Sequence, residues 1–129
     1  MLIENPIETR IATIFKDEND IIIIITMKNY GKVDEYDVID VNLVLRYKTN
    51  KQPALKLLDT RAIWSMDKKA KERAKFEDTV SITKARAIVI SLFRKVTNFN
   101  FLRQFCKKDY PQKFFTNKQE AYNWLLSQK

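Results

Sequence analysis

The residues best suited to chemistry follow a short, mostly apolar stretch at residues 54–58. Asp59, Thr60 and Arg61 come directly after it, so a hydroxyl lies beside a charged pair. Such a hydroxyl could accept a phosphate, whose charge of about −2 would recruit Arg61 or a nearby lysine. The other interpretation is structural, with Asp59 pairing with Arg61 or accepting from backbone amides of its own loop. We name this region the Asp59–Asp67 rim; its candidate residues are Asp59, Thr60, Arg61, Ser65 and Asp67.

Residue types that most active sites use are scarce in this chain. It contains no histidine, one glycine (Gly31) and one cysteine (Cys106). Histidine is the usual proton-transfer group near neutral pH and the commonest metal ligand. Glycine lets the backbone approach a phosphate closely. We therefore predict no catalytic residues, no metal site and no cofactor, and we expect Cys106 to be a buried small hydrophobe.

Four carboxylates gather where a helix is expected to begin, at Asp34, Glu35, Asp37 and Asp40. Asp37 and Asp40 share a helix face and could meet a cation there. No adjacent loop supplies the further oxygens that a cation needs. We expect these carboxylates to stabilise the helix N-terminus through its dipole instead.

A second candidate surface lies on a long helix that is expected over residues 92–106. One apolar stripe of this helix is expected to face the core, and three phenylalanines form a second stripe beside it. An exposed phenylalanine patch rimmed by basic residues would mark a protein, lipid or membrane contact. Alternatively, neighbouring helices cover this stripe. The candidate interface residues are Phe93, Arg94, Phe101, Phe105 and Lys108.

Charge is distributed unevenly along the chain, whose net charge is +8. Residues 1–40 contain nine acidic and four basic residues, whereas residues 41–129 contain seven acidic and twenty basic residues. This polarity can steer an anionic partner or favour head-to-tail association, or the bases can simply be solvated. Basic residues interleaved with aromatics would also suit nucleic acid. The aromatics have core-like spacing and no known nucleic-acid motif is recognised, so we do not expect nucleic acid to be a partner.

Hydrophobic periodicity predicts alternating strands and helices. Strands are expected at residues 9–15, 21–27, 54–58, 85–90 and 113–115. Helices are expected at residues 34–47, 68–78 and 92–106, with a last one after a capping box at residues 116–119. Asp67 is expected to cap the second helix. In the first helix, Tyr36, Ile39, Leu43 and Tyr47 fall on one apolar stripe, and Val41, Val44 and Leu45 widen it.

This order, strand–strand–helix and then three strand–helix pairs, predicts an α/β fold. Its sheet should be mainly parallel, with about five strands and right-handed crossovers. We expect a single domain over residues 1–129. The longest strongly apolar run, residues 21–25, is too short to span a bilayer. With one cysteine and no leader pattern, we expect a cytoplasmic protein.

Local sequence adds a family resemblance to this element order. Residues 57–61 look like an apolar strand that ends in Asp-x-Arg, and residues 85–89 before a Phe-rich helix are similar to the same family. The best match is residues 110–125, which combine a proline, an apolar strand, a Thr cap, Glu-Ala and Trp-Leu. The chain thus resembles the SpoIIAA-like (STAS/SEC14) family. In STAS regulators a Ser-Ser-Gly-like turn carries a phosphorylated serine, whereas the corresponding residues 59–67 here have only Thr60 and Ser65.

The resemblance implies a SpoIIAA-like fold more firmly than it implies an activity. The leading functional hypothesis is a non-enzymatic regulatory module that binds a protein partner, through the Asp59–Asp67 rim or the phenylalanine helix. Self-association through that helix would give a homodimer. The second hypothesis is a carrier of lipid or another apolar ligand, or a peripheral membrane binder. Nucleic-acid binding ranks third and an enzyme last.

Overall fold

The computed structural model of the chain describes residues 6–17, 22–28, 31–50, 52–62, 65–80, 82–91 and 109–129. Its strands are β1 (Ile7–Glu8), β2 (Ala12–Asp17), β3 (Ile22–Met27), β4 (Lys32–Val33), β5 (Ala54–Asp59), β6 (Ser65–Met66), β7 (Thr83–Val89) and β8 (Gln112–Phe115). Its helices are α1 (Glu35–Thr49), α2 (Lys68–Val80) and α4 (Lys118–Leu126). Every predicted strand and helix that falls within the described residues is present, with its ends shifted by a few residues.

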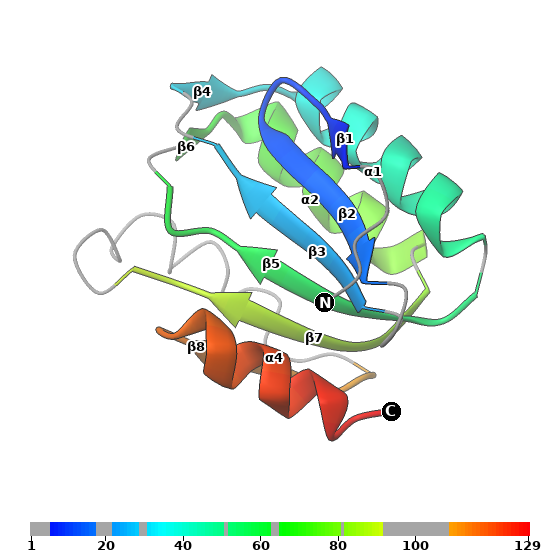
Figure 1. Cartoon of the computed structure of the whole chain (residues 1–129). Helices are drawn as coiled ribbons and strands as arrows, with labels where there is room; N and C mark the ends of the chain where they lie inside the picture. Colours follow the sequence, from blue (N-terminus) through cyan, green and yellow to red (C-terminus); the bar gives the residue numbers. More distant parts are fainter. Residues whose placement is uncertain are drawn as a thin grey trace.

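Six strands of the described chain form one sheet in the order β1-β2-β3-β5-β7-β8. The first three are antiparallel neighbours, whereas β3, β5, β7 and β8 run parallel. Helices α1 and α2 pack side by side on one face of this sheet, and α4 lies across the other face (Figure 1). The predicted mainly parallel α/β fold is therefore confirmed, and the two-residue β1 adds a sixth strand to the five expected.

A second, two-stranded sheet was not predicted. Strands β4 and β6 pair in parallel, with Lys32 opposite Ser65 and Val33 opposite Met66. Two residues are too few to show the period of two that identifies a strand in sequence. This small sheet joins the chain before α1 to the chain before α2.

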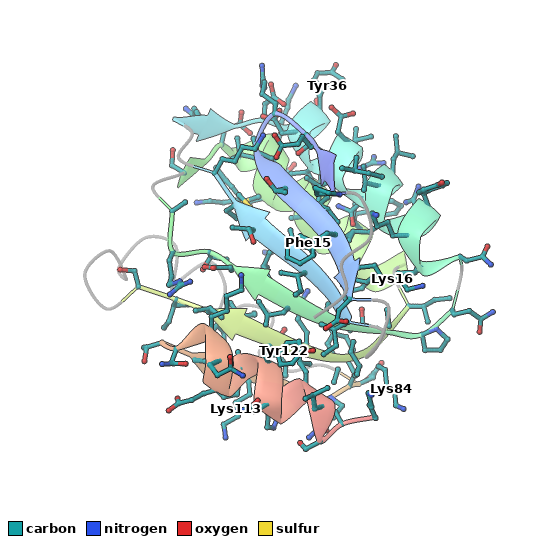
Figure 2. All side chains as sticks on the ribbon, viewed as in Figure 1. Phe15, Lys16, Tyr36, Lys84, Lys113 and Tyr122 are labelled. Atoms are coloured by element: carbon teal, nitrogen blue, oxygen red, sulfur yellow. The ribbon has the colours of Figure 1, made fainter. Side chains whose placement is uncertain are left out.

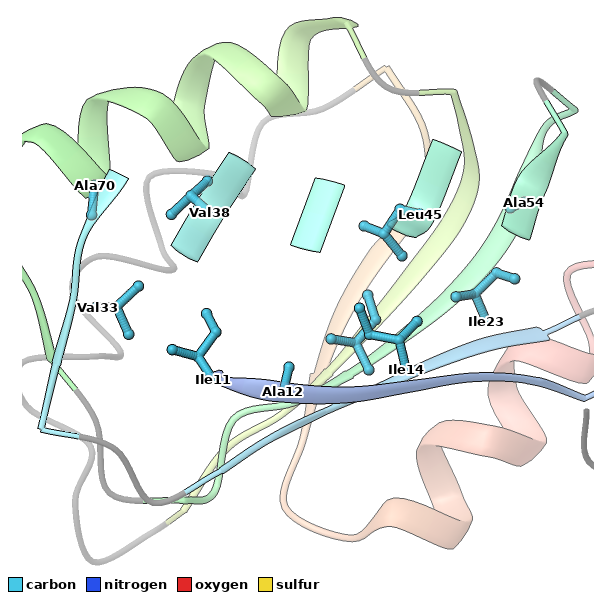
Figure 3. Packing of buried hydrophobic residues seen from close by; sticks show 10 residues of the cluster. Ile11, Ala12, Ile14, Ile23, Val33, Val38, Leu45, Ala54 and Ala70 are labelled. Atoms are coloured by element: carbon cyan, nitrogen blue, oxygen red, sulfur yellow. The ribbon is translucent and has the colours of Figure 1, made fainter. Parts of the chain in front are cut away.

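The apolar run of β3 forms the centre of the protein. Its four isoleucines are all buried, and they alternate between the two faces of the sheet, as side chains of a strand must. Ile23 and Ile25 pack in the cluster under α1 and α2, which Figure 3 shows from close by. Ile22 and Ile24 pack in the cluster that contains Ala121 and Leu125 of α4. The expectation of a strand covered on both faces is confirmed.

Helix α4 is anchored to its face of the sheet by a polar contact as well as by apolar packing. The hydroxyl of Tyr122 donates a hydrogen bond to the carboxylate of Asp17, which is fully buried at the end of β2. Tyr122 lies between α4 and the sheet in Figure 2. The contact joins residues 105 positions apart, so it ties the end of the chain to its first long strand.

The predicted apolar stripe of α1 is only partly correct. Tyr36, Leu43 and Tyr47 are 68%, 53% and 77% exposed, so this line of the stripe faces away from the core. Of the residues expected to widen the stripe, Leu45 is buried and Val41 and Val44 pack against the core, and the helix also buries Val38, which was not predicted. Two apolar stripes competed in the sequence, and valine and leucine fit closely against a sheet while each tyrosine keeps its hydroxyl in water.

The rotation of α1 is fixed at its N-terminus. Asp34 is the N-cap and Asp37 closes a capping box, each side chain accepting a hydrogen bond from the other's backbone N–H. Arg10, just before β2, donates to Asp37 through Nε and Nη2, both at 2.9 Å, and to Asp34 at 3.2 Å. Because Arg10 comes from the strand side, it turns Asp37 and its neighbour Val38 toward the sheet. The predicted role of these carboxylates at the helix start is confirmed.

Two further capping predictions have different outcomes. Asp67 accepts a hydrogen bond from the backbone N–H of Ala70 at 2.8 Å, so its predicted role at the start of α2 is confirmed. For α4, the predicted cap, Thr116, is wrong by one residue. The N-cap is Asn117, whose side chain accepts from the backbone N–H of Glu120 at 3.0 Å. Asparagine is at least as good an N-cap as threonine, so either residue fits the sequence pattern.

None of the helices among the described residues combines the length and apolar character needed to cross a membrane.

Candidate functional site

The Asp59–Asp67 rim begins at the carboxyl end of β5, in the middle of the parallel part of the sheet. Asp59 is the last residue of β5, and it lies opposite Thr26 of β3 on one side and Val89 of β7 on the other. Ligands of open α/β sheets bind at this end of the strands. The predicted position of the rim at the end of a parallel strand is confirmed.

Asp59 and Arg61 form a closed pair. The buried carboxylate of Asp59 accepts from Arg61 three times, from Nε at 3.0 Å, from Nη2 at 2.8 Å and from the backbone N–H at 3.2 Å. The structural interpretation of these two residues is therefore confirmed: Asp59 pairs with Arg61 and accepts a hydrogen bond from a backbone amide of its own loop. The side chain of Arg61 remains 43% exposed, so the pair has a buried anionic end and a solvent-facing cationic end.

The electrostatics of this pair follow from its geometry. Burial raises the pKa of the Asp59 carboxyl, but hydrogen bonds from Arg61 and the positive charges of Arg61 and Lys118 outweigh burial. The net result is a pKa below the ordinary aspartate value. The hydrogen bonds to Asp59 likewise raise the pKa of Arg61, against a smaller opposing effect of burial. Asp59 is thus an anion at neutral pH and is poorly suited to donate a proton.

The two hydroxyls of the rim differ in their surroundings. Thr60 is buried, and its hydroxyl and its backbone N–H both donate to the carbonyl of Val89, at 2.8 and 2.9 Å. A phosphate on Thr60 would require this residue to leave its position between β5 and β7. Ser65 is only partly buried, and its hydroxyl donates to the carbonyl of Gly31 at 2.9 Å. Ser65 is therefore the more accessible of the two.

The structure divides the rim into an inner and an outer part. In the inner part, Asp59 and Arg61 bind each other, and Thr60 binds Val89 at the end of β7. Ser65 lies in the small β4–β6 sheet, and Asp67 caps α2. Both outer residues therefore bond away from the Asp59–Arg61 pair, Ser65 to the carbonyl of Gly31 and Asp67 to the backbone of α2.

Lys118 is the site residue that sequence reasoning missed. It is the first residue of α4 and its charge acts on the Asp59 carboxyl. The two residues lie 59 positions apart, and no local pattern connects them. A signal was nevertheless available, because the strand at residues 112–115 and the helix after it were both predicted. In a parallel sheet, the point where this strand ends and the helix begins falls at the same edge of the sheet as the end of β5.

The acidic group at the start of α1 acts in the helix cap and in the ion pairs with Arg10. Within the described ranges, no three histidine, cysteine, aspartate or glutamate residues are grouped as metal ligands would be.

The phenylalanine helix predicted at residues 92–106 lies outside the described residues. The candidate interface residues Phe93, Arg94, Phe101, Phe105 and Lys108, together with Cys106, fall in that part of the chain.

Comparisons with known proteins agree with the fold. A family model described as "Domain of unknown function (DUF7793)" matches residues 14–129. A search of curated proteins finds no match. Among solved structures, the chain is similar to an uncharacterised protein of the DUF3478 family with a SpoIIAA-like fold, from Shewanella loihica PV-4. The TM-score is 0.55 at 16% identity, over 96% of this chain and 92% of that one. This likeness confirms the predicted SpoIIAA-like fold.

Proposed function

The chain belongs to the DUF7793 family of domains of unknown function, and we propose that it is a cytoplasmic, non-enzymatic regulatory module that binds a protein partner. The contact surface is the Asp59–Asp67 rim. The observation that carries this proposal is the Asp59–Arg61 pair, in which a buried carboxylate holds a half-exposed guanidinium at the carboxyl end of the parallel strands, where open α/β sheets generally bind ligands. An arginine held in one orientation loses less side-chain entropy when it binds, which favours recognition.

The chemistry of the rim favours a partner with an acidic contact surface. Arg61 and Lys118 both act on this edge with positive charge, and the whole chain carries a net charge of +8. An acidic partner would be steered toward such a surface, and its carboxylates would bind the exposed part of the guanidinium.

The experiment is recovery of the partner from native cells with tagged chain, followed by affinity measurement with the purified partner. We expect Arg61→Gln to weaken binding by about tenfold or more, because truncation of an arginine that is a hot spot of an interface typically weakens binding at least that much. Lys84→Gln is the matched control, since it removes one positive charge from an exposed residue near the opposite end of β7. Equal losses for the two variants would show that net charge, and not the rim, carries the binding.

If the module is switched by phosphorylation, Ser65 is the better acceptor. Its hydroxyl is more accessible than that of Thr60, and a phosphate there would break its hydrogen bond to Gly31 and repel nearby Asp67. Intact-mass measurement of chain purified from native cells, with peptide mapping, would locate the group. A phosphate on Thr60 but not on Ser65 would contradict this assignment.

Binding to an anionic membrane surface is the second candidate function, and one surface of α2 favours it. Phe76 is half-exposed on this helix, and Lys68, Lys69 and Lys75 are exposed along it, as is Glu72, which lines one groove with Phe76 and Lys69. An aromatic side chain among lysines can enter the interface of an anionic bilayer. Flotation with anionic and neutral vesicles tests this, and Phe76→Glu should abolish recovery with anionic vesicles. Wild-type chain that floats with neither would exclude membrane binding.

A further inference from the structure

No further inference is drawn: the strongest candidate, the groove between α1 and α2 beside the exposed outer face of α1, is lined by two carboxylates and two cations around Phe76, so its charge selects no ligand, and nothing in the described part of the structure shows what covers it.

Discussion

Two aspartate–arginine pairs in this protein look alike and do different things. Asp37 and Asp59 are both buried, and each is held by an arginine that is about half exposed, Arg10 in one case and Arg61 in the other. In both, burial raises the pKa of the carboxyl, but hydrogen bonds and positive charge from arginine outweigh burial, so both have a pKa below the ordinary value. The chemistry of the two pairs is nearly the same.

The difference lies in what each pair joins. Arg10 and Asp37 are 27 positions apart, and their contact fixes α1 against the strand side of the fold. Asp37 also closes the capping box with Asp34. Arg61 and Asp59 are two positions apart, so their contact closes only one turn of chain. The first pair therefore stabilises tertiary structure, whereas the second shapes a local surface at the end of β5.

The same substitution at both sites should separate these roles most clearly, and the largest effect should come from Asp37. We expect Asp37→Asn to lower the free energy of unfolding by about 2 kcal/mol, because it removes charge-assisted hydrogen bonds that link α1 to the strands. Urea unfolding measures the change. Asp40→Asn, the same change at an exposed position of the same helix, should stay within about 0.5 kcal/mol of wild type.

Asp59→Asn should cost less, about 1 kcal/mol or below. Asparagine keeps the size of the side chain and can still accept from the backbone of Arg61, and the lost ion pair joins no distant elements. Urea unfolding under the same conditions gives the comparison. A loss at Asp59 equal to or larger than that at Asp37 would contradict the distinction between a tertiary and a local pair.

The pH dependence of stability should sharpen the comparison further. Both carboxyls have a lower pKa in the folded state than the roughly 3.9 of an unfolded chain. Their contribution to stability is therefore complete above that value, and it is lost as the pH falls through the lowered folded-state pKa. We expect Asp37→Asn and Asp59→Asn each to lose less stability than wild type between pH 6 and pH 2.5. Glu8 also has a lowered pKa but is present in all three proteins, so its effect cancels. Parallel curves for wild type and both variants would refute the linkage.

Sequence patterns predicted the longer strands and the three helices of the described residues because each carries a local signal, whereas the two-residue strands β1, β4 and β6 carry none. The run of isoleucines in β3, the Asp67 cap and the strand at β8 all have local signals, and all are confirmed. The rotation of α1 could not be predicted in this way. Val38 and Leu45 compete with Tyr36 and Leu43 for the sheet, and the choice depends on Arg10, which lies 27 positions from its carboxylate.

The same division applies to the candidate site. Pairing of Asp59 with Arg61 is local, and the sequence contained that interpretation. The burial of Thr60 and its hydrogen bonds to Val89 depend on β7 lying next to β5. No sequence pattern within either strand indicates that the two strands are neighbours. The contribution of Lys118 depends on the direction of β8, since α4 begins where that strand ends. Long-range placement, more than residue type, is what single-sequence reasoning lacks here.

The smallest expected effect is also the most specific one. Lys118→Gln should raise the pKa of the Asp59 carboxyl slightly, because it removes a positive charge that helps to stabilise the anion. Arg61→Gln should raise it more, since that change removes hydrogen bonds as well as charge. Carbon-detected NMR titration of the aspartate carboxyls measures both shifts, and the Asp37 signal is the internal control. A shift of Asp59 alone would mean that α4 and the β5 loop act together as one surface. An equal shift in the pKa of Asp37 would mean that Lys118 acts only through the net charge of the chain. Lys118 would then not belong to the rim, and the rim would lack the second basic residue proposed to attract an acidic partner.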